Sequence, residues 1–167
     1  MRYSDGERLE RWALLFYSLY AIGLTVGGTA ARGEGGFILT YGSELRYVAA
    51  AILRNLPFFA AASMPGKRSV RFVSGMVSAI VFGLLAGISG VQALVSAEPA
   101  GAFMLCVLPK IIISVPIFIL ELCINQNRGD VPFSYHTVFL WILRAFLVAI
   151  SVSCVQFAIF FVFTQFN

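Results

Sequence analysis

The sequence has little charge and almost no histidine. Asp, Glu, Lys and Arg make up only 12% of its 167 residues, and it contains one histidine. A soluble domain carries about 25% charged residues. Folded in water, this chain would expose large apolar patches and aggregate. The scarcity of charge therefore argues against a soluble globular domain.

Candidate ligands and nucleophiles are also scarce. His136 is the one histidine, and the three cysteines, Cys106, Cys123 and Cys154, are dispersed in apolar stretches. An odd number of cysteines in such surroundings predicts free thiols packed as small apolar residues. No cluster has the spacing of a zinc or haem site. We expect no metal and no cofactor.

A basic face is missing as well, although the formal net charge is +4. The densest cationic run is Lys67, Arg68 and Arg71, and the other cations are scattered. Binding of nucleic acid needs a continuous basic surface, so the sequence predicts no nucleic-acid partner. The cations instead have the pattern of topology determinants in a membrane protein.

Hydrophobic residues make up 59% of the chain, and the mean hydropathy is +0.87. They fall in runs of about 20 residues, the length that spans a bilayer as a helix. The sequence predicts one all-α domain over residues 1–167, a polytopic transmembrane bundle of four to five spanning helices. The expected helices lie near 12–31, 72–97, 102–124 and 137–164, with an uncertain one at 43–64.

The uncertain segment carries Arg54, Asn55 and Pro57 near its middle. An arginine at the centre of a spanning helix costs about 2.5–3.5 kcal/mol. The segment either spans or lies in the membrane as a re-entrant or interfacial helix. The first apolar run could instead be a cleaved signal peptide, but acidic residues precede it and it is long, so we expect a retained helix.

The distribution of Lys and Arg predicts sidedness. With five spans, seven cations lie on the cytoplasmic side with the N-terminus, and two lie outside: Arg32 and Arg46. With four spans, the N-terminus lies outside instead, and the sidedness of the C-terminal half stays the same. Both arrangements put the C-terminus outward. Short loops and this bias favour a bacterial inner membrane.

Small residues recur along two predicted helices. Gly75, Ala79, Gly83 and Gly87 follow one another every four residues, and Gly23 and Gly27 form a second GxxxG motif. Small residues let two backbones approach closely within a membrane. The pattern predicts helix packing, either inside one chain or against another subunit.

Four ionisable residues fall inside the apolar runs: Arg54, Lys110, Glu121 and Arg144. Such residues suggest function by default. Glu121 and Arg144 flank the same loop, so they either pair or extend separately to the interface. Lys110 is deeper. It meets an acidic group of a partner, lines a polar cavity, or extends toward the outer face.

One apparent catalytic motif fails on topology. Gly87-Ile88-Ser89-Gly90 matches the GxSG pattern of rhomboid intramembrane proteases, which need a histidine near the serine. Here His136 lies by a cytoplasmic loop, whereas Ser89 lies near the outward end of its helix. We therefore expect no enzyme.

The sequence leaves three functions open. The first is a non-enzymatic subunit of a larger bacterial membrane assembly, or a homo-oligomer, whose partners are the bilayer and other membrane subunits or itself. The second is a small exclusion, immunity or anti-phage defence protein. The third is an oligomeric channel or transporter with Arg54, Lys110 and Arg144 along an anion path.

Overall fold

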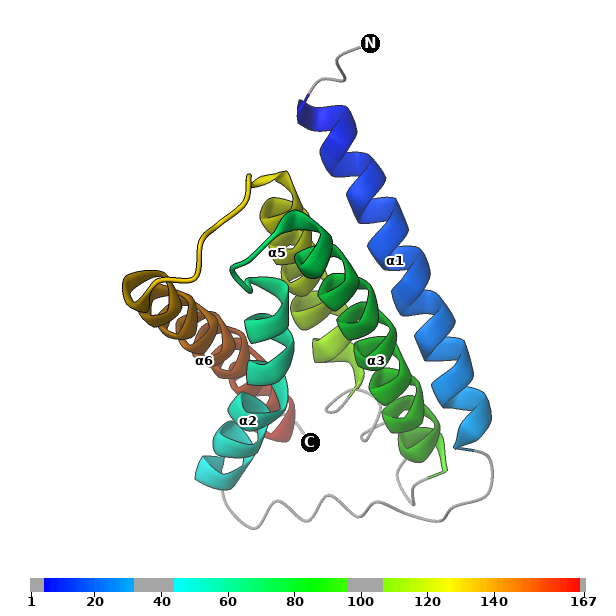
Figure 1. Cartoon of the computed structure of the whole chain (residues 1–167). Helices are drawn as coiled ribbons and strands as arrows, with labels where there is room; N and C mark the ends of the chain where they lie inside the picture. Colours follow the sequence, from blue (N-terminus) through cyan, green and yellow to red (C-terminus); the bar gives the residue numbers. More distant parts are fainter. Residues whose placement is uncertain (1–4, 32–43, 96–106, 166–167) are drawn as a thin grey trace.

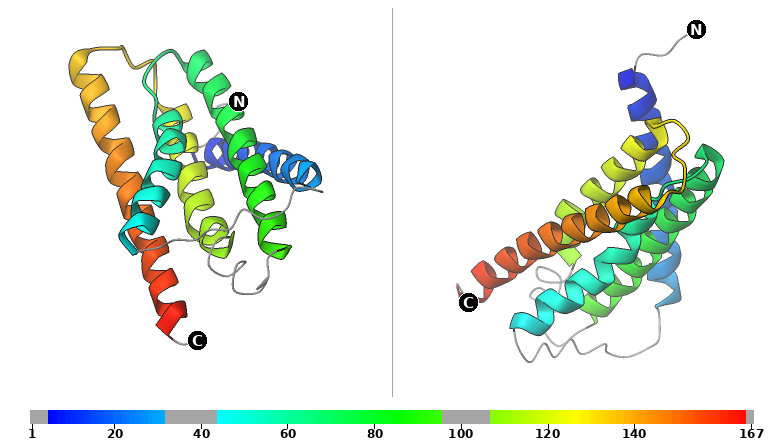
Figure 2. Two further views of the ribbon diagram at one scale, coloured as in Figure 1. Left: turned by 90° about the horizontal axis from the view of Figure 1, so that it is seen from below. Right: turned by 60° about the vertical axis from the view of Figure 1, so that its left-hand side comes forward.

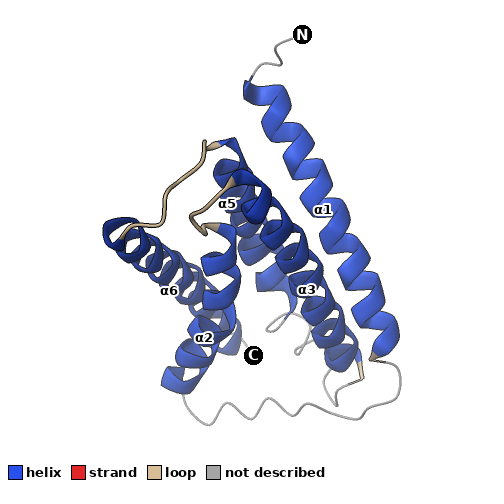
Figure 3. Ribbon diagram, viewed as in Figure 1, coloured by secondary structure: helices blue, strands red, loops and turns tan. Residues whose placement is uncertain are grey.

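The computed structural model of the chain describes residues 5–31, 44–95 and 107–165. Within these ranges the ordered elements are helical, and strand pairing is limited to one isolated bridge between Gly66 and Val131 (Figure 3). Four of the helices are long and apolar enough to cross a membrane. The prediction of an all-α, polytopic transmembrane bundle is confirmed.

The described helices are five α-helices and one π-helical segment. In chain order they are α1 (Asp5–Ala30), α2 (Glu44–Ala62), α3 (Arg68–Leu94), the π-helical segment η2 (Lys110–Ser114), α5 (Val115–Asn127) and α6 (Tyr135–Gln165). The four candidate spans are residues Gly6–Ala30, Arg68–Leu94, Lys110–Asn127 and Tyr135–Ile159. α2 contains a shorter apolar stretch, Ala51–Ala62.

Several helix ends differ from the predicted ones because charged residues continue the helices beyond the apolar runs. α1 already begins at Asp5, before residue 12, and α3 begins at Arg68 rather than 72. Lys, Arg and Glu are good helix formers, so a run of apolar residues underestimates helix length. The predicted boundaries at residues 43, 97 and 102 lie outside the described residues, as does Cys106.

The closest contact in the bundle joins α1 and α3. A methyl group added at Gly23 would lie under 3.0 Å from the carbonyl oxygen of Ile80, and one at Gly83 would lie as close to the carbonyl oxygen of Tyr20. Further along the contact, Gly27 faces the carbonyl oxygen of Leu84. Gly87 likewise faces the carbonyl oxygen of Leu24. The two glycine motifs therefore interlock within one chain, because only glycine leaves room for the opposing backbone.

The register of this contact gives the relative direction of the helices. Gly23 faces Ile80 and Gly27 faces Leu84, so residue numbers increase together and α1 and α3 run parallel. α2 connects the end of α1 to the start of α3. It consequently runs back along the bundle in the opposite direction (Figures 1 and 2).

Aromatic rings fill the space among α2, α3 and α5. The ring of Phe82 lies 4.5 Å from that of Phe58 and 5.0 Å from that of Phe118, centroid to centroid. Tyr20 of α1 adds an edge contact to Phe82 at 6.2 Å. Within a bilayer this packing, rather than burial from water, holds helices together. α2 is thereby an internal part of the bundle.

The glycine contact predicts a selective response to alanine. Gly83→Ala would force a methyl group into the backbone of α1, and such overpacking costs about 1–3 kcal/mol. We expect a lower midpoint of thermal unfolding in detergent.

Gly90→Ala is the matched control on the same helix, because a methyl group there meets nothing within 4 Å. It should leave the midpoint unchanged or raise it slightly, since alanine is the better helix former. Equal midpoints for the two variants would contradict the interlocked contact.

Candidate functional site: polar residues inside the bundle

Polar side chains gather around η2, the π-helical start of the candidate span Lys110–Asn127. The N–H of Val115 donates to the carbonyl of Lys110, five residues back. Pro116 follows and has no N–H to donate, which favours such a local change of winding. Lys110 and Ser114, at the two ends of η2, are both buried. The segment thus directs two polar side chains into the bundle.

The first polar group joins η2, α2 and α6. Ser114, Ser153, Asn55 and Gln156 are each no more than 1% exposed. The amide of Gln156 donates to Ser114 Oγ at 2.6 Å, and Asn55 Nδ2 lies 3.2 Å from Gln156 Oε1 and 3.3 Å from Ser153 Oγ. These bonds satisfy part of the polar group in its apolar surroundings, although Asn55 Oδ1 has no hydrogen-bond partner among the described residues. They tie α6 to the rest of the chain.

Lys110 has a different neighbour. Its Nζ donates to Ser89 Oγ of α3 at 3.1 Å, and the Ser89 hydroxyl donates its own proton to the carbonyl of Leu85. Serine beside lysine also occurs in Ser–Lys hydrolases, where a neutral lysine accepts the hydroxyl proton. Here the bonds run the other way. Ser89 thus gives the buried amino group of Lys110 a polar partner.

Glu121 and Arg144 form an ion pair between α5 and α6. Arg144 Nη2 lies 2.7 Å from one carboxylate oxygen of Glu121 and 2.9 Å from the other. The arginine side chain is 33% exposed and the glutamate 14%, so the arginine is the outer member. Pairing spares each charge an isolated position among apolar groups.

The three cations of the predicted anion path have different surroundings. Lys110 is bonded to α3, whereas Arg144 is paired with Glu121. Arg54 is half-buried on α2, and its Nε has no hydrogen-bond partner among the described residues. These contacts do not line up the three side chains along one route.

Arg71 is buried. The sequence predicts it only as one of the cations that determine topology. Its side chain is 1% exposed; Nη1 donates to Asn125 Oδ1 at 3.3 Å, and Nη2 donates to the carbonyls of Arg128 and Gly129 at 2.8 and 3.0 Å. A signal was present, because Arg71 lies four residues before Gly75 on the small-residue face. It joins the start of α3 to the end of α5.

The last turn of α2 is completed by side chains from other helices. Asn125 Nδ2 donates to the carbonyls of Ala62 and Met64, and the indole N–H of Trp141 donates to that of Ala60 at 2.8 Å. Helix ends leave backbone carbonyls without partners, which is expensive in an apolar medium. α5 and α6 therefore fix the position at which α2 ends.

The remaining predicted packing residues lie on the same inward face of α3. Ala79 is fully buried, and a methyl group at Gly75 would press on Leu122 and Phe16 at 3.1–3.2 Å. Together with the four interlocked glycines, they pack against elements of the same chain. Sequence spacing indicates this face, but it does not indicate which helix covers it.

The residues that might support catalysis or metal binding remain apart. His136 lies in the first turn of α6 and is exposed, whereas Ser89 lies near the C-terminal end of α3. Within the described ranges, no group of three His, Cys, Asp or Glu residues could hold a metal ion. The contacts between buried polar side chains join different helices.

Comparisons with other proteins add no further information. No protein-family model, curated protein or solved structure matches the chain. The site must be interpreted from its own geometry.

The polar group predicts a measurable coupling between α2 and α6. Asn55→Leu and Gln156→Leu each remove one side of their shared hydrogen bond. In a double-mutant cycle we expect a coupling free energy of about 0.6 kcal/mol and at most about 1.7, the range of such bonds in membrane proteins. Unfolding of the four proteins in mixed micelles measures it.

Ser151→Ala serves as the control, because that hydroxyl is exposed and donates to Leu147 in its own helix. Its unfolding free energy should stay close to that of the parent. Additive effects of the two leucine variants would show that the Asn55–Gln156 bond contributes nothing.

Proposed function

We propose that the protein is a non-enzymatic membrane subunit that packs, through α6, against a transmembrane helix of a partner protein or of a second copy. The outward face of the second half of α6 carries the proposal. Ser151, Cys154 and Ala158 are exposed there at three- and four-residue spacing, so they lie along one line of the helix.

This line differs from the rest of the exposed surface of α6. In the first half the exposed residues are large, among them Phe139, Ile142, Leu143 and Phe146. Large apolar side chains suit contact with lipid tails, whereas small residues let another helix approach closely. The Ser151 hydroxyl is bonded within its own helix, so this residue offers little polarity to its surroundings.

A hollow also lies beside the end of α6. It has a volume of about 250 Å³ and is lined by residues of α6 alone: Val155, Ala158, Ile159 and Val162. The glycine faces of α1 and α3 are covered by each other, so they do not remain for a partner. α6 offers a small-residue surface that these glycine contacts do not cover.

We infer a sidedness that follows from the parallel contact of α1 and α3. If both helices span, they enter the bilayer from the same side, and α2 must return across it. Five crossings then place the termini on opposite sides. The excess of Lys and Arg puts the N-terminus in the cytoplasm and the C-terminus outside. A bacterial inner membrane suits this arrangement.

Native mass spectrometry of the protein, extracted gently from its own host membranes, tests the proposal. We expect a discrete complex that contains a second membrane protein or a second copy. Ala158→Phe should reduce the complex by about tenfold or more, because the added ring would hold the two helices apart.

Val77→Phe provides the control, since Val77 is exposed on the outer face of α3, away from α6. It should leave the complex intact. Free monomer from the parent protein, or equal loss in both variants, would argue against an α6 interface.

A further inference from the structure

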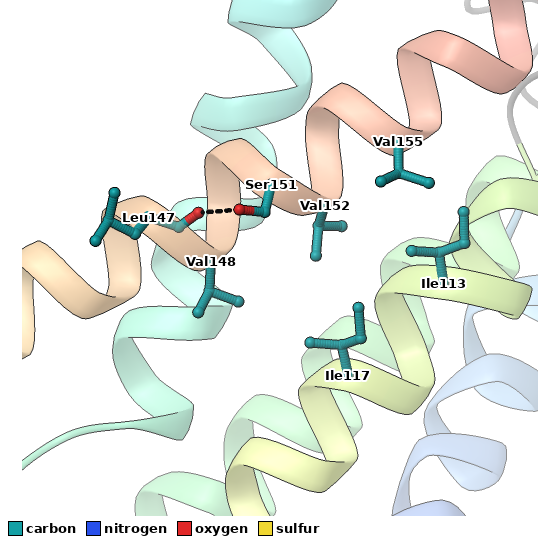
Figure 4. A pocket seen from close by; sticks show the side chains of 7 residues that line it. All are labelled: Ile113, Ile117, Leu147, Val148, Ser151, Val152 and Val155. Carbon is teal, nitrogen blue, oxygen red and sulfur yellow. Dashed lines mark hydrogen bonds between the residues drawn. The ribbon is translucent and has the colours of Figure 1, made fainter.

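An apolar groove runs between α6 and the η2–α5 helix. It has a volume of about 320 Å³ and is lined by six aliphatic side chains and one hydroxyl: Ile113, Ile117, Leu147, Val148, Ser151, Val152 and Val155 (Figure 4). The Ser151 hydroxyl donates to Leu147, so the groove presents no unbonded polar group from its lining.

Polar contacts join the two helices near both ends of the groove. At one end the Glu121–Arg144 ion pair lies one helical turn beyond Ile117 and Val148. At the other end Gln156 donates to Ser114 at 2.6 Å. The two helices are therefore joined at two levels and separated between them. A full helix, about 10 Å across, is too wide for the space between helices joined in this way.

Arg144 has donors left for another ligand. Only its Nη2 bonds Glu121, and within the described part of the chain neither Nη1 nor Nε has an acceptor. Side chains on a helix lean toward its N-terminus, so the guanidinium group lies on the side of the groove nearer the start of α6. A phosphate is the anion that such planar donors bind well.

We propose that this groove binds one acyl chain of a phospholipid, with the lipid phosphate on Arg144. The lining extends from Leu147 to Val155 of α6, eight steps that span about 12 Å at 1.5 Å per residue. One leaflet has a hydrocarbon thickness of about 15 Å. The groove thus has the length, the apolar lining and the cation at one end that a single phospholipid requires. Ser151 lies at the border of this groove and of the proposed α6 interface, whereas Cys154 and Ala158 do not line the groove, so the two sites are tested with different residues.

Titration of the delipidated full chain with palmitoyl-oleoyl phosphatidylglycerol, followed by native mass spectrometry, tests the site. We expect one tightly held lipid per chain. Ile117→Trp should abolish it by filling the groove, and Leu147→Trp should do the same from the exposed rim, where folding is less at risk. The double variant Glu121→Gln/Arg144→Gln, which leaves no unpaired charge, should weaken binding about ten- to hundredfold.

The matched control is Val77→Trp, which adds the same ring to an exposed residue of α3. It should retain the lipid, and inorganic phosphate should not compete, because the chain contributes most of the binding. Three results would overturn the proposal: no lipid bound to the parent, equal binding in the groove variants and the control, or a second protein chain bound where the lipid is expected. Unchanged affinity in the double variant would overturn the role of Arg144.

Discussion

The close approach of the backbones of α1 and α3 is the contact on which the arrangement of the chain depends. Carbonyl oxygens of each helix lie where side chains of the other would be, and four glycines make this possible. Because the contact is parallel, the chain between the two helices has to return along the bundle. α2 occupies that return path in spite of Arg54, Asn55 and Pro57, and its aromatic residues complete the core around Phe82 and Phe118.

α6 is held by a different kind of interaction. Its inward residues contribute few large side chains, since Ala145, Ala149 and Ser153 lie at the contact. Instead, hydrogen bonds and one ion pair join it to α2, η2 and α5. Such bonds are geometrically specific but individually weak in membrane proteins. This explains how α6 can be fixed in position and still leave a groove on one side and a small-residue surface on the outside.

The class of protein could be predicted from the sequence, because the length and composition of apolar runs directly reflect the bilayer. The stripe at Gly75, Ala79, Gly83 and Gly87 could be predicted too, but its partner could not, since GxxxG spacing is the same for contacts within and between chains. The burial of Arg71 could not be predicted from its charge. It becomes evident only when the small-residue stripe is continued by four residues from Gly75 toward the N-terminus. The polar group of Asn55, Ser114, Ser153 and Gln156 depends on long-range pairing and on the winding of η2, and neither follows from local spacing.

The sidedness of the two termini tests the account most directly. A fluorescent protein that folds only in the cytoplasm and a phosphatase active only outside can be fused, one at a time, to each end of the full chain. The parallel contact of α1 and α3 predicts an odd number of crossings, with the N-terminal reporter active as the fluorescent protein and the C-terminal one as the phosphatase. If both termini report the same side, α2 does not cross and the parallel arrangement is wrong.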